Sequence, residues 1–190
     1  MTAELDRPAG WPPALRFLLE RHPREAWAGD AALGALGRYW LERHASFREL
    51  IDMLGAATAE FQAGRMAPAE FRPWFAPRLQ FFLSHLGGHH EVEDYHYFPL
   101  LRAAEPRLAA GFDLLAADHE AIHGAIVDTV EAANALLTAP PGADAERTAG
   151  ERYAASSARL FAGLLRHLDD EEDLIIPLLL DRGEAALEVG

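Results

Sequence analysis

A histidine followed four residues later by a glutamate occurs twice in the sequence. His89 precedes Glu93, and His167 precedes Glu171. In both copies a Pro-Leu pair begins ten residues after the histidine. Residues four apart on an α-helix lie on one face, about 6 Å apart along the axis, so each pair can hold a cation between an imidazole and a carboxylate. Two such pairs predict a paired-metal site.

Three further histidines fall in register with apolar stripes. His44 lies four residues after Trp40 and three before Phe47, and His119 and His123 are themselves four residues apart. Burying this many polar groups without partners would cost several kcal/mol for each ionised one, and a coordinated metal compensates directly. The candidate metal ligands are therefore His44, His89, Glu93, His119, His123, His167 and Glu171.

Composition narrows the class of protein. The 190 residues suffice for one domain with a real core, and half of them are hydrophobic. The formal charge of −13 argues against nucleic acid and against an anionic membrane surface. Cysteine is absent, which excludes disulfides, thiolate metal sites and iron–sulfur clusters. With no secretory signal and no apolar run of membrane-spanning length, we expect a soluble, cytoplasmic protein.

The elements that must position these ligands are helical. Apolar residues recur at three- and four-residue steps, and the alternation of a strand is absent. We predict an all-α, antiparallel up-down-up-down four-helix bundle over residues 30–182. A short helical arm, 1–29, precedes it, and a loose tail, 183–190, follows.

The expected helix bounds follow from capping residues, prolines and glycines. In the arm, a short helix starts at Pro12-Pro13 and ends at Pro23. The four long helices are expected from Asp30, as N-cap, to Gly64; from about Trp74 through Leu100; from Pro106 to the residues before Pro140; and from about Asp144 to Arg182. Gly87-Gly88 falls inside the second of these, where each glycine costs about 1 kcal/mol relative to alanine. Close helix contact or local flexibility beside the site would explain that cost.

Five histidines and two carboxylates spread in this order over four helices resemble the hemerythrin-like family, the histidine–histidine–glutamate cation-binding bundles. The resemblance covers roughly residues 30–182. It implies a non-haem di-iron centre with an oxo or hydroxo bridge between two iron ions. By this resemblance His119, His123 and His167 hold one iron and His44 and His89 the other, while Glu93 and Glu171 bridge them. It also implies that dioxygen, or a related small ligand, binds at an open iron position.

Several alternatives stay open on the sequence. Glu172 competes with Glu171 as the bridging carboxylate, because the oxygen-carrying relatives place that residue five positions after the histidine. Enzymatic use of the same centre (an oxidase, or peroxide or nitric oxide handling) and an iron sensor or store are alternatives to oxygen binding. A ferritin-like site built on Glu93-x-x-His96 and Glu120-x-x-His123 ranks lower.

Other polar residues near the motifs have weaker claims. His85 is a candidate for an extra ligand or a supporting contact, and Tyr97 for a hydrogen bond near the metals. We expect His90 and His96 to be solvated.

Overall fold

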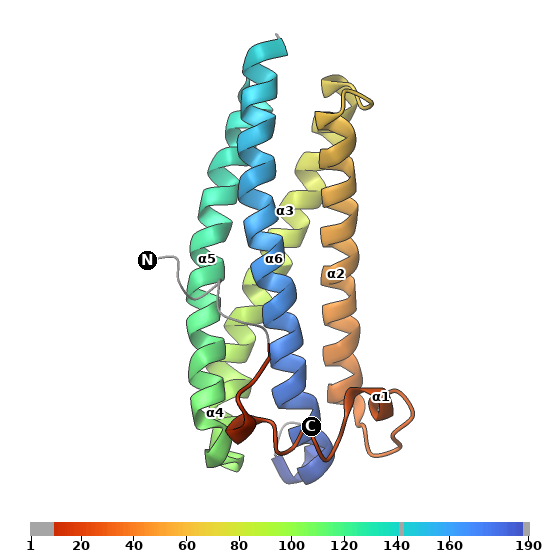
Figure 1. The fold of residues 1–190 in the computed structure, drawn as a ribbon, viewed down its shortest axis with the longest axis vertical. Helices are drawn as coiled ribbons and strands as arrows, with labels where there is room; N and C mark the ends of the chain where they lie inside the picture. The colour runs from red at the N-terminus through yellow and green to blue at the C-terminus, as the bar shows by residue number, and fades with distance from the viewer. Residues whose placement is uncertain (1–9, 141–142, 188–190) are drawn as a thin grey trace.

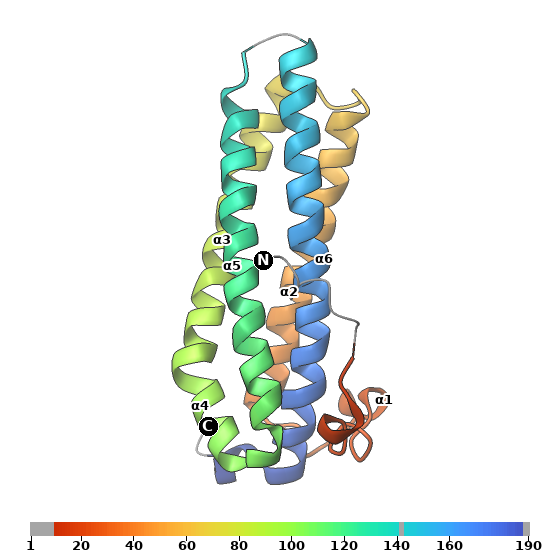
Figure 2. The same cartoon turned by 60° about the vertical axis from the view of Figure 1, so that its left-hand side comes forward.

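In the computed structural model, which describes residues 10–140 and 143–187, four long helices lie side by side. They are α2 (Ala35–Gln62), α3 (Pro68–Val92), α5 (Ala109–Thr138) and α6 (Ala143–Arg182). In Figures 1 and 2, α2 and α5 rise from the lower end of the bundle, and α3 and α6 return to it. The described residues contain no strand, so the all-α prediction is confirmed.

Short elements cluster at the lower end. They are η1 (Pro13–Leu15), α1 (Arg24–Trp27), the π-helical η2 (Glu93–Tyr97), α4 (Phe98–Ala104), η3 (Pro106–Leu108) and η4 (Glu184–Leu187). The segments η2 and α4 continue α3, so the second long helix of the bundle reaches the lower end with one irregular turn inside it.

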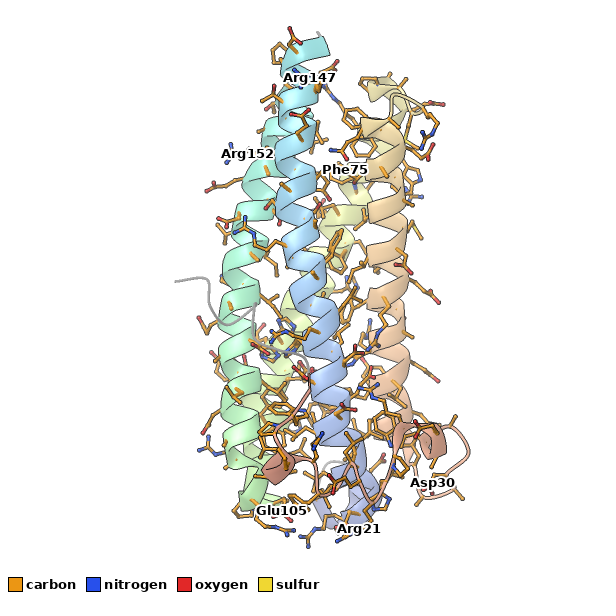
Figure 3. All side chains as sticks on the ribbon, viewed as in Figure 1. Arg21, Asp30, Phe75, Glu105, Arg147 and Arg152 are labelled. Atoms are coloured by element: carbon orange, nitrogen blue, oxygen red, sulfur yellow. The ribbon has the colours of Figure 1, made fainter. Side chains whose placement is uncertain are left out.

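The core consists of two apolar clusters, one above the other. The upper cluster includes Phe47, Phe75 and Ile122, and Figure 3 shows Phe75 between the helices in the upper half. The lower cluster includes Trp40 and Leu115 and also takes in the arm. On α2 and α5 the residue between the two clusters is a histidine, His44 or His119 (each on the three/four-residue seam). A polar layer thus divides the core.

The arm differs from the helix expected between Pro12 and Pro23. Only Pro13–Leu15 forms a short 3-10 helix, and the α-helical turn comes later, at Arg24–Trp27. Between these two turns the segment makes local backbone hydrogen bonds, such as the one from the His22 amide to the Leu18 carbonyl oxygen at 2.8 Å. The Trp11 indole donates to the Asp170 carbonyl oxygen at 2.7 Å, holding the arm against α6.

The start of α2 is also corrected. The helix begins at Ala35, not after Asp30, because its first amides are capped from the other end of the chain. The Glu184 carboxylate accepts hydrogen bonds from the amides of Leu36, at 3.1 Å, and Gly37, at 2.8 Å. The described part of the expected loose tail is ordered, since Glu184–Leu187 forms the 3-10 helix η4 and Leu187 is 5% exposed. Residues 188–190 lie outside the described part.

Helix α3 begins at Pro68 rather than near Trp74, and Pro73 and Pro77 lie inside it. Phe71 and Phe75 on the same segment are fully buried, and their packing offsets the hydrogen bonds that the prolines cannot donate. Across the described ranges, none of the helices combines the length and the apolarity needed to cross a bilayer.

Candidate metal centre

Two groups of ligand atoms meet in the polar layer. His90, His119 and His167 form the first, and all three are buried. His44, His89, Glu93 and Glu171 form the second. Within each group the ligand atoms lie within 4.8 Å of one another. All four long helices contribute, counting the π-helical turn as part of the second.

The imidazoles of the site face each other in pairs through their Nε2 atoms. His44 Nδ1 lies 3.0 Å from Glu172, and His119 Nδ1 lies 2.8 Å from Asp94. A carboxylate oxygen accepts, so each Nδ1 carries the proton and each Nε2 presents a lone pair. Yet His44 Nε2 lies 3.2 Å from His89 Nε2, and His119 Nε2 lies 3.1 Å from His167 Nε2. Lone pairs converging in this way suit a cation.

The two glutamates lie between the groups. Glu93 Oε1 is 2.9 Å from His89 Nε2, and Glu93 Oε2 is 3.6 Å from His119 Nε2. Glu171 Oε2 is 3.2 Å from His167 Nε2 and 3.7 Å from His44 Nε2. Each carboxylate therefore reaches a histidine of both groups, as a residue shared by two ions must.

Glu171 and Glu172 have separate places. Glu171 is fully buried between the histidines, and its Oε1 accepts the indole N–H of Trp40 at 2.7 Å. Glu172 lies behind His44, where it accepts hydrogen bonds from Arg48 and Arg24, each at 2.7 Å. The geometry therefore gives the shared position to Glu171, and it makes Glu172 a support for His44.

Unsatisfied buried atoms test whether a metal fits. Both oxygens of Glu93, Oε2 of Glu171 and Nε2 of His90 are buried without a hydrogen-bond partner. Such atoms cost about 1–3 kcal/mol each, more when charged. These four atoms belong to the two ligand groups, whereas other such atoms, including Nε of Arg72, lie away from the layer. A donor set of imidazoles and carboxylates suits iron and other divalent transition metals. The residues present fit a metal pair.

Proton occupancy in the metal-free site follows from burial. Desolvation, together with the neighbouring Glu171, raises the pKa of Glu93 well above its ordinary value. Glu171 is desolvated too, but His44 and His167 outweigh this and hold its pKa well below the ordinary value. One carboxyl of the pair is thus neutral and the other ionised.

The imidazoles are tuned mostly toward the neutral form that binds metals. Desolvation lowers the pKa of His89 to about 3, and it lowers the pKa of His90 and His119 as well. Desolvation acts the same way on His167, but the nearby carboxylates of Asp118 and Glu171 outweigh it and raise its pKa.

The structure does not bring His123 to the other predicted ligands. The seam of α5 runs through Leu115, His119 and Ile122, so His123 lies one position past it and is exposed. In its place comes His90, which we expected to be solvated; it is 7% exposed and its ring stacks on His119 at 4.0 Å between centroids. The signal was present in the spacing of Leu86 and His90, which continues the α3 seam by one step of four.

The remaining candidates lie outside the two groups. His85 is exposed, with its ring on Phe81 and Nδ1 bonded to the Phe81 carbonyl oxygen at 2.9 Å. The ring of Tyr97 contacts that of Trp40, 5.1 Å between centroids. His96 and Glu120 are exposed, like His123, so neither Glu-x-x-His motif forms an inward clamp.

A four-helix bundle with imidazoles and shared carboxylates in its core defines the class of helical proteins that bind a metal pair between their helices. The model of one such family, described as the hemerythrin HHE cation-binding domain, matches residues 36–181. The chain belongs to this family. No curated protein and no solved structure gave a significant match.

Proposed function

We propose that the chain holds two iron ions in this layer and binds dioxygen, or another small ligand such as a peroxide, at an open position on one of them. Iron so held supplies a redox-active pair that a small ligand can reach. Three histidines and the two shared glutamates supply five donor residues on one side, whereas His44 and His89 with the same glutamates supply four on the other. This asymmetry is the observation that carries the proposal.

The open side coincides with a cavity that reaches the centre beside His89. A cavity of about 410 Å³ is lined by His89 and Glu93, but by no member of the three-histidine group. A ligand entering there meets the four-donor side first. The three-histidine side is closed by ring packing, since His119 lies between the rings of His90 and Phe98, 4.0 and 5.3 Å away.

The protein's own contribution is to fix the donors and to limit water. The Trp40 indole holds the shared Glu171, and the carboxylates of Glu172 and Asp94 fix the imidazoles of His44 and His119. The apolar clusters above and below keep bulk water out of the layer.

Metal analysis of matched histidine variants tests the ligand assignment. Wild type is expected to carry about two irons per chain; His90→Ala and His89→Ala lose iron, while the exposed His123→Ala retains it. Retention by His90→Ala with loss by His123→Ala would return the ligand set to the one expected from the sequence. A single zinc per chain would contradict the di-iron proposal.

Gas exposure tests the function. The reduced iron protein is expected to change its visible spectrum under dioxygen and to recover it under vacuum. Irreversible bleaching, or turnover of added peroxide, favours a di-iron enzyme instead. Iron binding with no spectral response to any of these ligands favours a store or sensor.

A further inference from the structure

The cavity beside His89 is far larger than a diatomic ligand requires. Its volume of about 410 Å³ lies in the range of pockets that enclose small organic molecules, about 300–1,000 Å³. It lies between α2 and α3 with the π-helical turn, and its lining includes Tyr39, Trp40, Arg43, Gly88, His89 and Tyr97. A site for a diatomic ligand alone would not need the outer half of this cavity.

Three aromatic side chains form its walls. Trp40 is buried at the inner end, and the Tyr97 ring meets it edge-on, with 5.1 Å between centroids and 67° between planes. Tyr39 stands at the mouth and is 52% exposed. Aromatic walls around a narrow space favour a planar ring, which they contact edge to face or offset.

The charge at the mouth is positive. Arg43 lies over the Tyr39 ring, 5.4 Å from its centroid, and donates to the Tyr39 hydroxyl oxygen at 2.9 Å. Among the described residues no carboxylate forms an ion pair with Arg43, although Arg24, Arg48 and Arg166 near the centre are all paired. A guanidinium without an ion-pair partner favours a carboxylate ligand and disfavours an organic cation.

Polar groups beside Arg43 complete the mouth. Ser84 offers a hydroxyl, and His85 has its Nδ1 engaged by the Phe81 carbonyl, which leaves Nε2 toward other partners. The one acidic side chain in the lining is Glu93, and it is buried at the inner end, in the metal layer. The cavity thus offers a cationic, hydrogen-bonding mouth and an aromatic interior.

Close helix contact does not explain the Gly87-Gly88 pair, because a Cβ at either position would meet no atom within 4 Å. Gly88 lines the cavity, and a Cβ at that position would meet no atom within 4 Å, so the helix face is open there. A Cβ at Gly87 would also meet nothing, but Gly87 does not line the cavity. The two adjacent glycines therefore differ in whether they line the cavity, and there is room for a Cβ at either position.

We propose that this cavity binds a small aromatic carboxylate, with its ring between Tyr39, Trp40 and Tyr97 and its carboxylate at Arg43. The site is built from the chain's own side chains and does not require iron. That the bound ring then lies beside the open side of a metal pair rests on the proposed function.

Titration with benzoate, followed by calorimetry and by ligand-observed NMR, tests the site on metal-free and on iron-loaded protein. Wild type binds benzoate in both forms, and benzylamine at least tenfold more weakly. Gly88→Leu fills the cavity and weakens benzoate binding at least tenfold, while the matched control Gly87→Leu leaves it within twofold. Arg43→Met, a surface change that spares the core, weakens benzoate about tenfold by removing the charge-assisted contact.

Each contrary result is decisive. No benzoate binding to wild type at millimolar concentration, equal weakening by Gly87→Leu and Gly88→Leu, or equal affinity for benzylamine overturns the proposal. Thermal melts of both leucine variants establish that they fold; if Gly88→Leu does not, the Arg43→Met result decides. Because the metal-free arm needs no iron, failure of iron loading leaves this test intact and counts against the proposed function alone.

Discussion

At the scale of single residues, the centre depends on what stands behind each ligand. Three imidazoles have a carboxylate at Nδ1: Glu172 behind His44 at 3.0 Å, Asp94 behind His119 at 2.8 Å, and Asp118 behind His167 at 3.7 Å. A carboxylate in this position fixes the ring and its tautomer and makes Nε2 more basic. Asp94 and Asp118 were not among the candidate residues, and Glu172 was considered only as an alternative bridging carboxylate, because a supporting acid has no fixed spacing from the histidine it meets.

Trp40→Phe removes the one hydrogen bond that Glu171 Oε1 receives in this structure. A buried carboxylate oxygen without a donor costs about 1–3 kcal/mol, so we expect urea unfolding of the metal-free variant to show a loss of that size, along with weaker iron retention. Trp74→Phe is the control, since Trp74 is half-buried and its ring contacts Arg78 rather than the centre. Equal losses in the two variants would assign Trp40 to packing alone.

Glu172→Gln tests the support behind His44. The amide still accepts from His44, but Arg24 and Arg48 each lose one of their two charged partners, so the imidazole is held less firmly. We expect iron affinity, measured by competition with a chelator, to fall 10- to 100-fold.

Asp173→Asn is the matched control for Glu172→Gln, because it also breaks an ion pair of Arg24 yet leaves Glu172 in place. Iron affinity should change less than threefold in this variant. An equal fall in both would show that the arm, and not the contact with His44, governs the affinity.

The ligand set shows how far residue spacing alone can be taken. The structure brings His44, His119 and His167 into one layer, as their three/four-residue spacing predicted, and the same spacing places His90 in that layer and His123 outside it. The i, i+4 pairing of His119 and His123 was a competing signal, and the seam outweighed it because side chains off the seam face water. Spacing within one helix counts only after the buried face of that helix is known.

At the scale of elements, the π-helical turn Glu93–Tyr97 is the main feature that the sequence did not reveal. It begins at a ligand and contains Asp94, which supports His119. Such turns recur at functional sites, because an extra residue re-aims the side chains around it. Pro99 follows within two residues and can donate no bond to the carbonyl of Tyr95, which lies inside the turn. The proline was visible in the sequence, but its local consequence depended on packing.

The Glu184 cap of α2 joins two elements that are distant in sequence. Its approach needs Gly34, where a Cβ would come within 2.1 Å of the carboxylate. Glu184→Ala leaves two first-turn amides without this partner, and we expect a loss of about 1 kcal/mol in urea unfolding. Gly34→Ala should cost about as much, and the double variant little more, because both remove the same contact. Additive losses would separate the two effects.

At the scale of the whole molecule, the four long helices were predictable because their seams extend through both apolar clusters. The arm and the C-terminal turn were not predictable, because tertiary contacts determine their positions. Trp11 contacts Asp170, and Glu184 contacts the first turn of α2. The same organisation leaves the centre as a polar layer between two well-packed halves. The free energy of the whole bundle should therefore respond to what fills that layer.

Removing metal should lower the melting temperature. An ion present at about 1,000 times its dissociation constant stabilises the native state by about 4 kcal/mol, which corresponds to roughly 8–16 °C for a chain of this size. We expect that difference between iron-loaded and chelator-treated protein in a calorimetric melt. Equal melting temperatures would mean that the layer does not bind iron in the folded state.

The stabilisation by metal should grow as pH rises, and the sign follows from Glu93. The folded-state pKa of Glu93 is raised by burial and by Glu171, so above the ordinary pKa of 4.5 the metal-free fold retains a proton that the unfolded chain releases. The contribution of Glu93 to metal-free stability therefore falls as pH climbs from 4.5 through the folded pKa, whereas the lowered pKa values of His89 and His90 act in the opposite direction. The bound ion needs Glu93 deprotonated, so loading releases that proton and is favoured by higher pH.

The melting difference between the loaded and metal-free protein should be larger at pH 8 than at pH 6. Glu93→Gln, which cannot titrate, should remove the Glu93 contribution to the pH dependence of the metal-free melt, and a dependence unchanged in that variant would contradict the assignment to Glu93.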